Sequence, residues 1–406
     1  MRLLTSALVL WGLAACAPEA QETADTRAAT PPTPAASAEP PSSPPAARPA
    51  NAAEALAPYY AQLDIESPRP ATLQTLPPQD AVLSRIAFGS CNNEDEPIPA
   101  LSAAAARDPD VFIYAGDNVY GDARRVDPDL PELRESYATL AAHPDFQALA
   151  AQTPILAMWD DHDFGLNDAG RRFAFKGYAE TLFLDFWGAS AEDPRRDRPG
   201  VYDAHVFGPE DQRVQIILLD TRYFRDDLKV TEIEDPQRRG RYVPHDPADG
   251  KTLLGEAQWA WLEEQLRQPA QVRLIVSSIQ ILAESHGFER WGNMPNERQR
   301  LFDLITETGA EGVVLLSGDR HIAAAYKSED AIGYPVWELT SSALNRTNRN
   351  GEPEYDAAQV QTTFATNNFG EVGVDWEAET VTLRLFDAEG AEGQAHVLAF
   401  SDLRTN

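Results

Sequence analysis

The stretch DVFIYAGDNVYGD, residues 110–122, sets the architecture that we expect for this chain. Its first half, residues 111–115, holds only apolar and aromatic side chains, which is typical of a strand buried on both faces. A glycine and then Asp117 follow at once, and Tyr120 comes three positions later. Because ligands of open α/β sheets bind beyond the carboxyl ends of the strands, Asp117 and Tyr120 are candidates for a functional site.

Five further apolar runs resemble this one and are separated by helix-like segments. We expect buried strands within residues 83–91, 110–117, 154–162, 214–222, 272–280 and 312–321. We expect helices within residues 98–107, 131–142, 173–188, 255–268 and 295–309. After residue 334 the pattern changes to alternating apolar and polar residues, which predicts antiparallel strands. The chain is therefore predicted to be an α/β protein with a late β-rich part.

Four of the six predicted strands end in residues that can bind metals or transfer protons. These residues are Cys91 after the first run, Asp117 and Tyr120 after the second, Asp160, Asp161 and His162 after the third, and Asp319 and His321 after the last. The carboxyl ends of parallel strands meet at one edge of a sheet. We therefore expect the four clusters to converge on one site.

Such a site gathers several acidic groups that repel one another. Desolvating an ionised carboxylate without a counter-ion costs on the order of several kcal/mol, so we expect bound cations to compensate these charges. Thiolate and phenolate ligands favour a highly charged, softer ion such as ferric iron, Fe³⁺, whereas carboxylate and amide oxygens favour Ca²⁺, Mg²⁺ or Mn²⁺. The expected site holds two or more metals, with one bridging aspartate, and can clamp both oxygens of an in-line displacement at phosphorus.

Five motifs together resemble the alkaline phosphatase D family of PhoD-like metallophosphatases. They are FGSCN, GDNVYGD, WDDHDFGLND, LDTRYFRD and SGDRH, and they occur in the family's order across roughly residues 84–345. The resemblance implies a calcineurin-like, four-layer sandwich, in which two mixed β-sheets are flanked by helices. It also implies an iron–calcium site that hydrolyses phosphomonoesters, phosphodiesters or both with a metal-bound hydroxide. Full-length members carry an extra β-rich domain before the first motif, so this chain resembles the shorter, core-only form.

The resemblance assigns ligands to a first, iron-binding position. Cys91 stands where other metallophosphatases have an aspartate, and it is expected to bind iron. Tyr120 is expected to bind the same ion as a phenolate, and His321 is expected to complete this position. Asp117 is expected to bridge the iron to a second metal.

The same resemblance assigns ligands to a second, calcium-binding position, where Mn²⁺ or Mg²⁺ are the expected substitutes. Asp161 occupies the usual asparagine position of the second metal, and Asp319 is expected to close that site. Asn167, followed by Asp168, resembles an additional calcium-ligand segment. His162 is expected near the leaving group, either as a general acid or as a stabiliser of the charge that develops during the reaction.

Three neighbouring residues have a structural and a functional interpretation. Asp160 is interpreted as structural, orienting a histidine that contacts the metals. Arg222 and Arg225, in LDTRYFRD, either contact the phosphate of the substrate or form ion pairs with Asp220 and Asp226. We favour the ion pairs for both arginines because these aspartates lie so close in the sequence.

The chain begins with a segment that is typical of an export signal. Residues 1–16 combine Arg2, an apolar stretch too short to span a bilayer comfortably, and LAAC, which resembles the lipobox of bacterial lipoproteins. We expect cleavage before Cys16, lipidation of that cysteine, and a membrane-anchored protein of the bacterial periplasm or cell envelope. The alternative is an ordinary secretory signal. Residues 17–58, rich in alanine and proline, are predicted to be a disordered tether, and residues 59–406 to form the metallophosphatase domain.

The net charge of −30 narrows the range of partners. The sequence has no basic stripe that could neutralise a nucleic-acid backbone, so we expect small-molecule or lipid phosphate esters and a membrane surface instead. We expect a monomer. The alternatives to a general phosphoesterase are a phospholipase-like phosphodiesterase that acts on lipid headgroups, and a surface lipoprotein that binds metals without catalysis.

Overall fold

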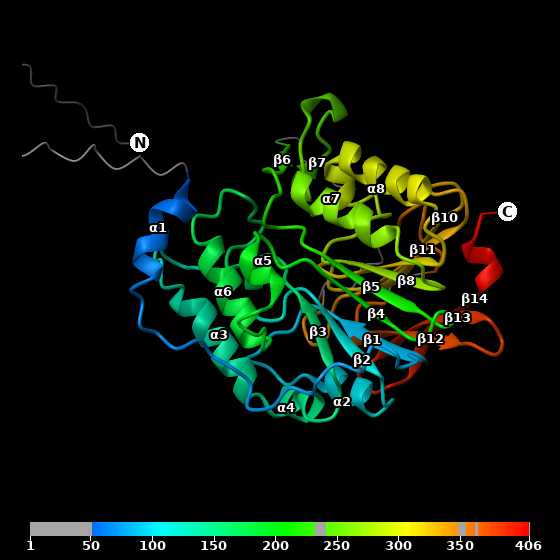
Figure 1. Ribbon diagram of the computed structural model, residues 1–406, viewed down its shortest axis with the longest axis horizontal. Helices are drawn as coiled ribbons and strands as arrows, with labels where there is room; N and C mark the ends of the chain where they lie inside the picture. The colour runs from blue at the N-terminus through cyan, green and yellow to red at the C-terminus, as the bar shows by residue number, and fades with distance from the viewer. Residues whose placement is uncertain (1–50, 232–240, 348–354, 362–363, 406) are drawn as a thin grey trace, which may run out of the picture. The chain divides into compact units, whose positions relative to one another are not determined.

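The computed structural model describes residues 51–231, 241–347, 355–361 and 364–405. The predicted signal peptide, Cys16 and the predicted tether up to residue 50 lie outside the described residues. In the described part, two six-stranded sheets lie face to face between layers of helices (Figure 1). This arrangement confirms the predicted four-layer α/β sandwich.

The first sheet is mixed and is built on three of the predicted buried strands. Its strands, in the order β14-β13-β12-β1-β2-β3, are β1 (Arg85–Gly89), β2 (Val111–Ala115), β3 (Ile155–Met158), β12 (Asn368–Asp375), β13 (Thr380–Asp387) and β14 (Glu392–Ala399). β1, β2 and β3 are parallel, and β12 to β14 are antiparallel to their neighbours. Successive side chains of a strand face opposite sides. Ile113 therefore belongs to the core shared with the second sheet, and Phe112 and Tyr114 to the core beneath the helices.

The second sheet contains the other three predicted buried strands. In the order β10-β11-β9-β8-β5-β4, its strands are β4 (Asp203–Phe207), β5 (Val214–Leu219), β8 (Val272–Ser277), β9 (Val313–Ser317), β10 (Ala323–Ser328) and β11 (Val336–Ser341). β11, β9, β8 and β5 are parallel, and the edge strands β10 and β4 are antiparallel. The late strands are thus antiparallel as predicted, except that β11 also pairs in parallel with β9. A two-stranded ribbon is formed by β6 (Lys229–Val230) and β7 (Tyr242–Val243).

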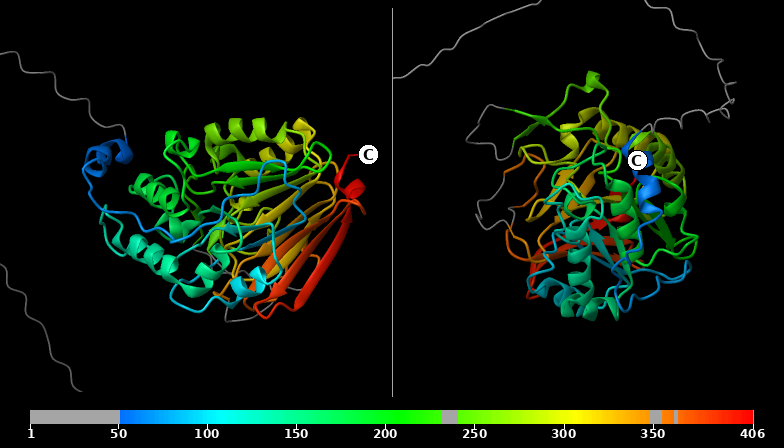
Figure 2. Two further views of the ribbon diagram at one scale, coloured as in Figure 1. Left: turned by 60° about the horizontal axis from the view of Figure 1, so that its bottom comes forward. Right: turned by 90° about the vertical axis from the view of Figure 1, so that its left-hand side faces the viewer.

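Helices cover the outer faces of both sheets (Figures 1 and 2). The helices beside the first sheet are α2 (Pro99–Ala105), α3 (Pro131–Ala142), α4 (Pro144–Ala150) and α6 (Lys176–Phe186), and those beside the second are α7 (Gly255–Leu266) and α8 (Pro295–Thr308). Pro131 and Pro295 occupy the first turn, where a helix needs no N–H from that residue. Gly309, with φ of 66°, ends α8 in the left-handed conformation that glycine adopts without strain.

Helix α1 (Ala52–Tyr60) corrects the predicted boundary of the tether. Asn51 caps it by accepting a hydrogen bond from the N–H of Glu54 at 2.9 Å. The ring of Tyr60 stacks on that of Tyr178 in α6, with 4.9 Å between the centroids. The ordered part therefore begins before residue 59, because this short helix has a cap and an aromatic contact that composition alone did not indicate. Among the described helices, none is both long enough and apolar enough to cross a membrane.

Candidate metal centre

Four candidate ligands lie in tight turns at the carboxyl ends of strands. Cys91 follows β1, Asp117 follows β2, and Asp319 and His321 follow β9. Their φ angles are all positive, at 58°, 49°, 67° and 57° respectively. Non-glycine residues rarely adopt this conformation, and where they do the surrounding structure must hold them in it, most often at functional sites. The fold thus keeps four predicted ligands in a backbone conformation that local preferences disfavour.

A single helical turn, α5 (Asp161–Phe164), positions Asp161 and His162. It follows β3 and begins after Asp160. The buried carboxylate of Asp163 accepts hydrogen bonds from the N–H groups of Asp160 at 2.5 Å and Asn118 at 3.1 Å. Asn118 belongs to the loop after β2, so this carboxylate joins the loops that carry two of the predicted clusters.

Cys91, Asp117, Tyr120 and His321 contact one another. The Sγ atom of Cys91 lies 3.4 Å from Oδ2 of Asp117, and the hydroxyl of Tyr120 donates to the same oxygen at 3.3 Å. That hydroxyl is also 3.1 Å from Nε2 of His321. Ser342 steadies the group, because its Oγ lies 3.1 Å from the Cys91 sulfur and accepts a hydrogen bond from the His321 N–H at 2.7 Å. The structure therefore brings together the residues expected around iron, and their binding of a metal stays a prediction.

A cluster of carboxylates adjoins this group. Asp117, Asp160, Asp161 and Asp319 each offer one oxygen, and these oxygens all lie within 4.8 Å of one another. Asp117 and Asp161 are 1% and 3% exposed, and Oδ1 of each has no hydrogen-bond partner among the described residues. An unpartnered buried carboxylate oxygen is costly unless a cation lies nearby. The carboxylates therefore fit a hard cation, and the adjoining sulfur, phenol and imidazole donors fit a softer one.

Burial disfavours the charged forms of the candidate ligands. It raises the pKa of the Cys91 thiol to about 11 and holds the pKa values of Asp117 and Tyr120 well above their ordinary ranges. Burial, together with the positive charge of Arg346, lowers the pKa of His321 to about 3, so its imidazole is neutral. Metals bind neutral imidazole and the deprotonated forms of thiol, phenol and carboxyl groups. A bound polyvalent cation would therefore stabilise the negative charges that burial disfavours.

His162 lies beside the cluster and is held by a residue that the sequence analysis did not single out. Its Nδ1 is 2.5 Å from Oδ2 of Asp122, and its ring centroid is 4.2 Å from that of Tyr120. Burial opposes the imidazolium, but the carboxylates of Asp161, Asp117 and Asp122 raise the pKa of His162 to about 11. Asp122 therefore orients the imidazole of His162 beside the cluster. The signal for Asp122 was its place at the end of GDNVYGD.

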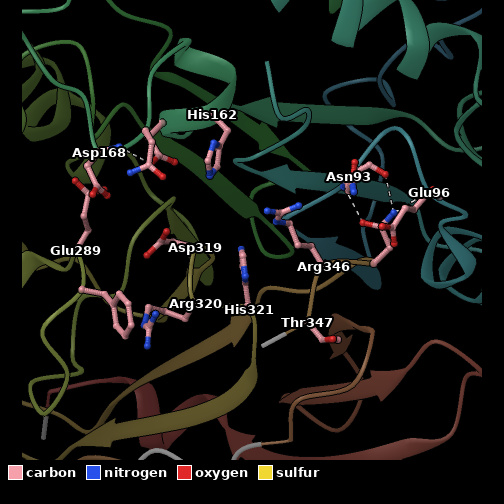
Figure 3. Close-up of a pocket in the computed structure, with 14 residues that line it drawn as sticks. Asn93, Glu96, His162, Asp168, Glu289, Asp319, Arg320, His321, Arg346 and Thr347 are labelled. Atoms are coloured by element: carbon pink, nitrogen blue, oxygen red, sulfur yellow. Dashed lines mark hydrogen bonds between the residues drawn. The ribbon is translucent and has the colours of Figure 1, made fainter. Parts of the chain in front are cut away.

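Four of the candidate ligands line a cavity of about 600 Å³, namely Asp161, Asn167, Asp319 and His321 (Figure 3). His162 also lines it, and of these residues Asn167 is exposed. The neighbouring Asp168 donates its backbone N–H to Oδ2 of Asp161 at 2.6 Å, and its carboxylate accepts a hydrogen bond from the hydroxyl of Tyr242. The predicted calcium-ligand segment thus lies at the cavity, and its contact with Asp161 is made by the backbone.

A buried ion network supports the cluster from behind. Arg222, which is fully buried, pairs with Asp160 at 2.5 Å and with Glu289. Arg225 pairs with the other oxygen of Glu289 at 2.9 Å and donates to the carbonyl of Asp168 at 2.6 Å. Since these residues follow β3, β5 and β8, the network connects the two sheets next to the candidate metal centre.

The network corrects the predicted partners of the two arginines. The carboxylate of Asp220 accepts the backbone N–H groups of residues 201, 222 and 223, each at 2.9 Å, and Asp226 pairs with Arg171 at 2.6 Å. Asp160 pairs with Arg222 instead of orienting a histidine, and its interpretation as a structural residue stays a prediction. Sequence proximity was a poor guide because Asp220 and Asp226, although buried, are engaged by backbone N–H groups and by Arg171. The loops after β3 and β8 supply the carboxylates that the buried guanidinium groups need.

Four charged residues that line the cavity were not predicted as site residues. They are Glu96, Glu289, Arg320 and Arg346. Arg320 had a signal, because it lies between the two candidate ligands of SGDRH. Glu289 lies deep in the connection between β8 and α8, and Arg346 follows β11, so neither comes directly after a strand with a recognised motif.

Comparisons with known proteins agree with this geometry. The family model of PhoD-like phosphatases matches residues 86–385. Alkaline phosphatase D of Bacillus subtilis (strain 168) is 24% identical over 288 residues, which cover 62% of this chain and 48% of that protein. The chain therefore spans about half the length of this curated relative.

Two solved structures share the fold. A structure of PhoD aligns with a TM-score of 0.61 and 19% identity, covering 80% of this chain and 70% of that one. GAP50, described as the anchor in the inner membrane complex of Plasmodium, aligns with a TM-score of 0.50 and 12% identity, covering 79% and 89%. At these identities the likenesses establish the fold alone.

Proposed function

Because the chain belongs to the PhoD-like phosphatase family, we propose that it is a metal-dependent phosphoesterase that hydrolyses phosphomonoesters, phosphodiesters or both. The observation that carries this proposal is the contact of Cys91, Asp117, Tyr120 and His321 beside a carboxylate cluster that borders a cavity. The buried carboxylate oxygens without hydrogen-bond partners support a site that takes cations.

The donor types support iron at one position and calcium at the other. The proposed iron ligands are Cys91, Tyr120 and His321, the proposed calcium ligands are Asp161, Asn167 and Asp319, and Asp117 is proposed to bridge the two ions. Manganese or magnesium can replace calcium at oxygen ligands. When bound, such ions lower the pKa of water and neutralise charge on the phosphoryl oxygens.

His162 is proposed to donate the proton that the leaving group requires. The carboxylate of Asp122 holds Nδ1 at 2.5 Å, which leaves Nε2 as the nitrogen that can transfer a proton. His162 and Asp161 both line the cavity, and their ligand atoms lie within 4.8 Å of one another. An oriented imidazolium beside the cluster can protonate the departing alkoxide, and Asp122 keeps it in the orientation for that transfer.

Release of p-nitrophenol tests the proposal. The wild-type protein is expected to hydrolyse p-nitrophenyl phosphate, bis(p-nitrophenyl) phosphate or both, and Asp117→Asn and Cys91→Ala are expected to lower the rate at least a hundredfold and to reduce the bound metal. Asp303→Asn, on the exposed face of α8, is the matched control and should change neither. Equal activity in all four proteins would contradict the site, and a wild-type protein that binds metals without releasing p-nitrophenol would be a binding protein.

We also propose that the protein is exported and anchored to a membrane through Cys16. The support is the signal-like segment of residues 1–16, which ends in LAAC. Cells that express the full chain are expected to incorporate a palmitate analogue into it, and Cys16→Ala is expected to abolish the label and release the protein from the membrane fraction. A label that persists in the variant would show that this assignment is wrong.

A further inference from the structure

We infer that Arg346 is a further substrate-binding residue of this site, which contacts the terminal phosphoryl oxygens and favours phosphomonoesters over phosphodiesters. The inference rests on the proposed function and adds the substrate class to it. Arg346 follows β11 and lies outside the five motifs that carry the family resemblance.

The side chain of Arg346 reaches over the candidate iron ligands. Its guanidinium carbon lies 4.2 Å from the centroid of the Tyr120 ring, whose hydroxyl contacts Asp117 and His321. A guanidinium above a phenol ring is held by the attraction between a cation and the π-electrons. Figure 3 shows Arg346 pointing into the cavity, toward His162 and His321.

The backbone beside Arg346 is fixed, whereas its charge has no acidic partner among the described residues. The side chain of Asn345, which is 9% exposed, accepts a hydrogen bond from the N–H of Asn93 and donates one to its carbonyl, both at 2.7 Å. These bonds tie the segment after β11 to the loop after β1. In the part of the chain that the structure describes, Arg346 forms no ion pair, although the sequence holds 64 acidic residues. An arginine placed in this way is available to an anion that enters the cavity.

Arg320, the other arginine at the cavity, is packed differently. It is 5% exposed, and its guanidinium carbon lies 4.2 Å from the centroid of the Phe288 ring. Arg346 is exposed, so its side chain has room to follow a bound phosphate. The structure therefore favours Arg346 as the residue that adapts to the substrate.

The two ester classes differ in the number of terminal oxygens and in the negative charge that Arg346 can contact. A phosphomonoester has three terminal oxygens and up to two negative charges, whereas a diester has two terminal oxygens and one charge. Guanidinium binds such groups best with two parallel N–H donors. A monoester can offer two oxygens to Arg346 and keep a third for the metal centre, which a diester cannot do. Arg346 therefore stabilises a bound monoester more than a bound diester.

Steady-state kinetics with two variants test the inference. Arg346→Met removes the guanidinium, and Arg346→Lys keeps the charge without the two-pronged geometry. In Arg346→Met we expect kcat/KM to fall about ten- to a hundredfold for p-nitrophenyl phosphate and less than about threefold for bis(p-nitrophenyl) phosphate, with Arg346→Lys in between. Arg267→Met, at the end of α7, is the control and should match the wild type. Unchanged metal content and unfolding temperature are expected to show that each variant is folded and loaded.

If kcat/KM of Arg346→Met falls equally for both esters, the proposed preference for monoesters is wrong. If kcat/KM falls for neither ester, the proposed contact of Arg346 with the substrate is wrong. Calorimetric binding of inorganic phosphate to the metal-loaded protein provides a readout that does not depend on turnover. We expect the dissociation constant to rise about tenfold or more in Arg346→Met and to stay unchanged in Arg267→Met. If phosphate binding depends on Arg346 while the wild type hydrolyses neither ester, the proposed function is wrong and the contact stands. If phosphate binding is the same in all proteins, the contact is wrong.

Discussion

Replacing Arg222 with methionine tests the buried ion network behind the candidate metal centre. The Arg222 side chain is 0% exposed and pairs with Asp160 and Glu289, which are 1% and 2% exposed. Methionine fills part of the same space, but it leaves both carboxylates without this cation. Since Arg222 follows β5 and Asp160 follows β3, the substitution also removes a charged contact between the two sheets.

The size of the effect follows from the contacts that remain. Removing one partner of a buried ion pair costs about 3–5 kcal/mol. After the substitution, Ser278 still donates to Asp160 at 2.5 Å and Arg225 still pairs with Glu289 at 2.9 Å. We therefore expect a loss of about 3 kcal/mol in the free energy of unfolding. For the compact unit Pro49–Asn406, this corresponds to a fall of about 4 °C in the unfolding temperature.

Urea denaturation followed by tryptophan fluorescence measures the free energy, and calorimetry measures the unfolding temperature. Arg267→Met is the matched control, because Arg267 pairs with Glu263 at the surface and its loss should cost about 0.5 kcal/mol or less. Adding Asp160→Asn to Arg222→Met should restore part of the lost stability, because it removes one of the stranded charges. A loss below about 1 kcal/mol in Arg222→Met would refute this account of the network. A double variant that loses more stability than the two single variants lose in sum would refute it as well.

Asp122→Asn is expected to lower kcat about tenfold or more at unchanged metal content, because Nδ1 of His162 loses its carboxylate partner; an unaltered kcat would contradict the role given to Asp122. Burial, followed by the charge of Asp220, raises the pKa of Glu180 from 4.5 to about 8, so the folded protein holds this proton more tightly than the unfolded chain does. The contribution of this group to wild-type stability should therefore fall as the pH rises from about 4.5 to 8, by up to roughly 5 kcal/mol, and urea titrations of Glu180→Gln should show a smaller fall. An equal pH dependence in both proteins would count against this pKa. Iron-loaded wild type should absorb visible light through bound phenolate, and a Tyr120→Phe variant with the same spectrum would exclude Tyr120 as an iron ligand.

The central strands could be predicted because each is buried on both faces. All five residues of β2, for example, are buried, and all five are apolar or aromatic, as such a strand requires. The alternating pattern after residue 334 correctly predicted antiparallel pairing for β12 to β14. It did not predict that β11 pairs in parallel with β9, because pairing depends on which strand lies alongside and both directions suit the same side chains.

The candidate ligands could be predicted because they follow these strands directly, within motifs that resemble a known family. Their partners were harder to predict. Asp122 contacts His162, and Glu289 pairs with Arg222. In both cases the two residues belong to different loops. The aspartates nearest to Arg222 in the sequence are also buried, but they bind backbone N–H groups or another arginine instead. The partner of a desolvated charge is therefore set by how the loops pack and not by sequence distance.

The sequence by itself determined the buried strands, the helices between them and the residue types that gather where the strands end. Only the tertiary structure decided that Asp122 holds His162, that Arg222 bridges the two sheets, and that Arg346 lies over a phenol ring. The physical reason is that burial of a strand is encoded in its own run of side chains. Contact between side chains from different strands depends on how two sheets pack, and no local pattern of residues specifies that packing.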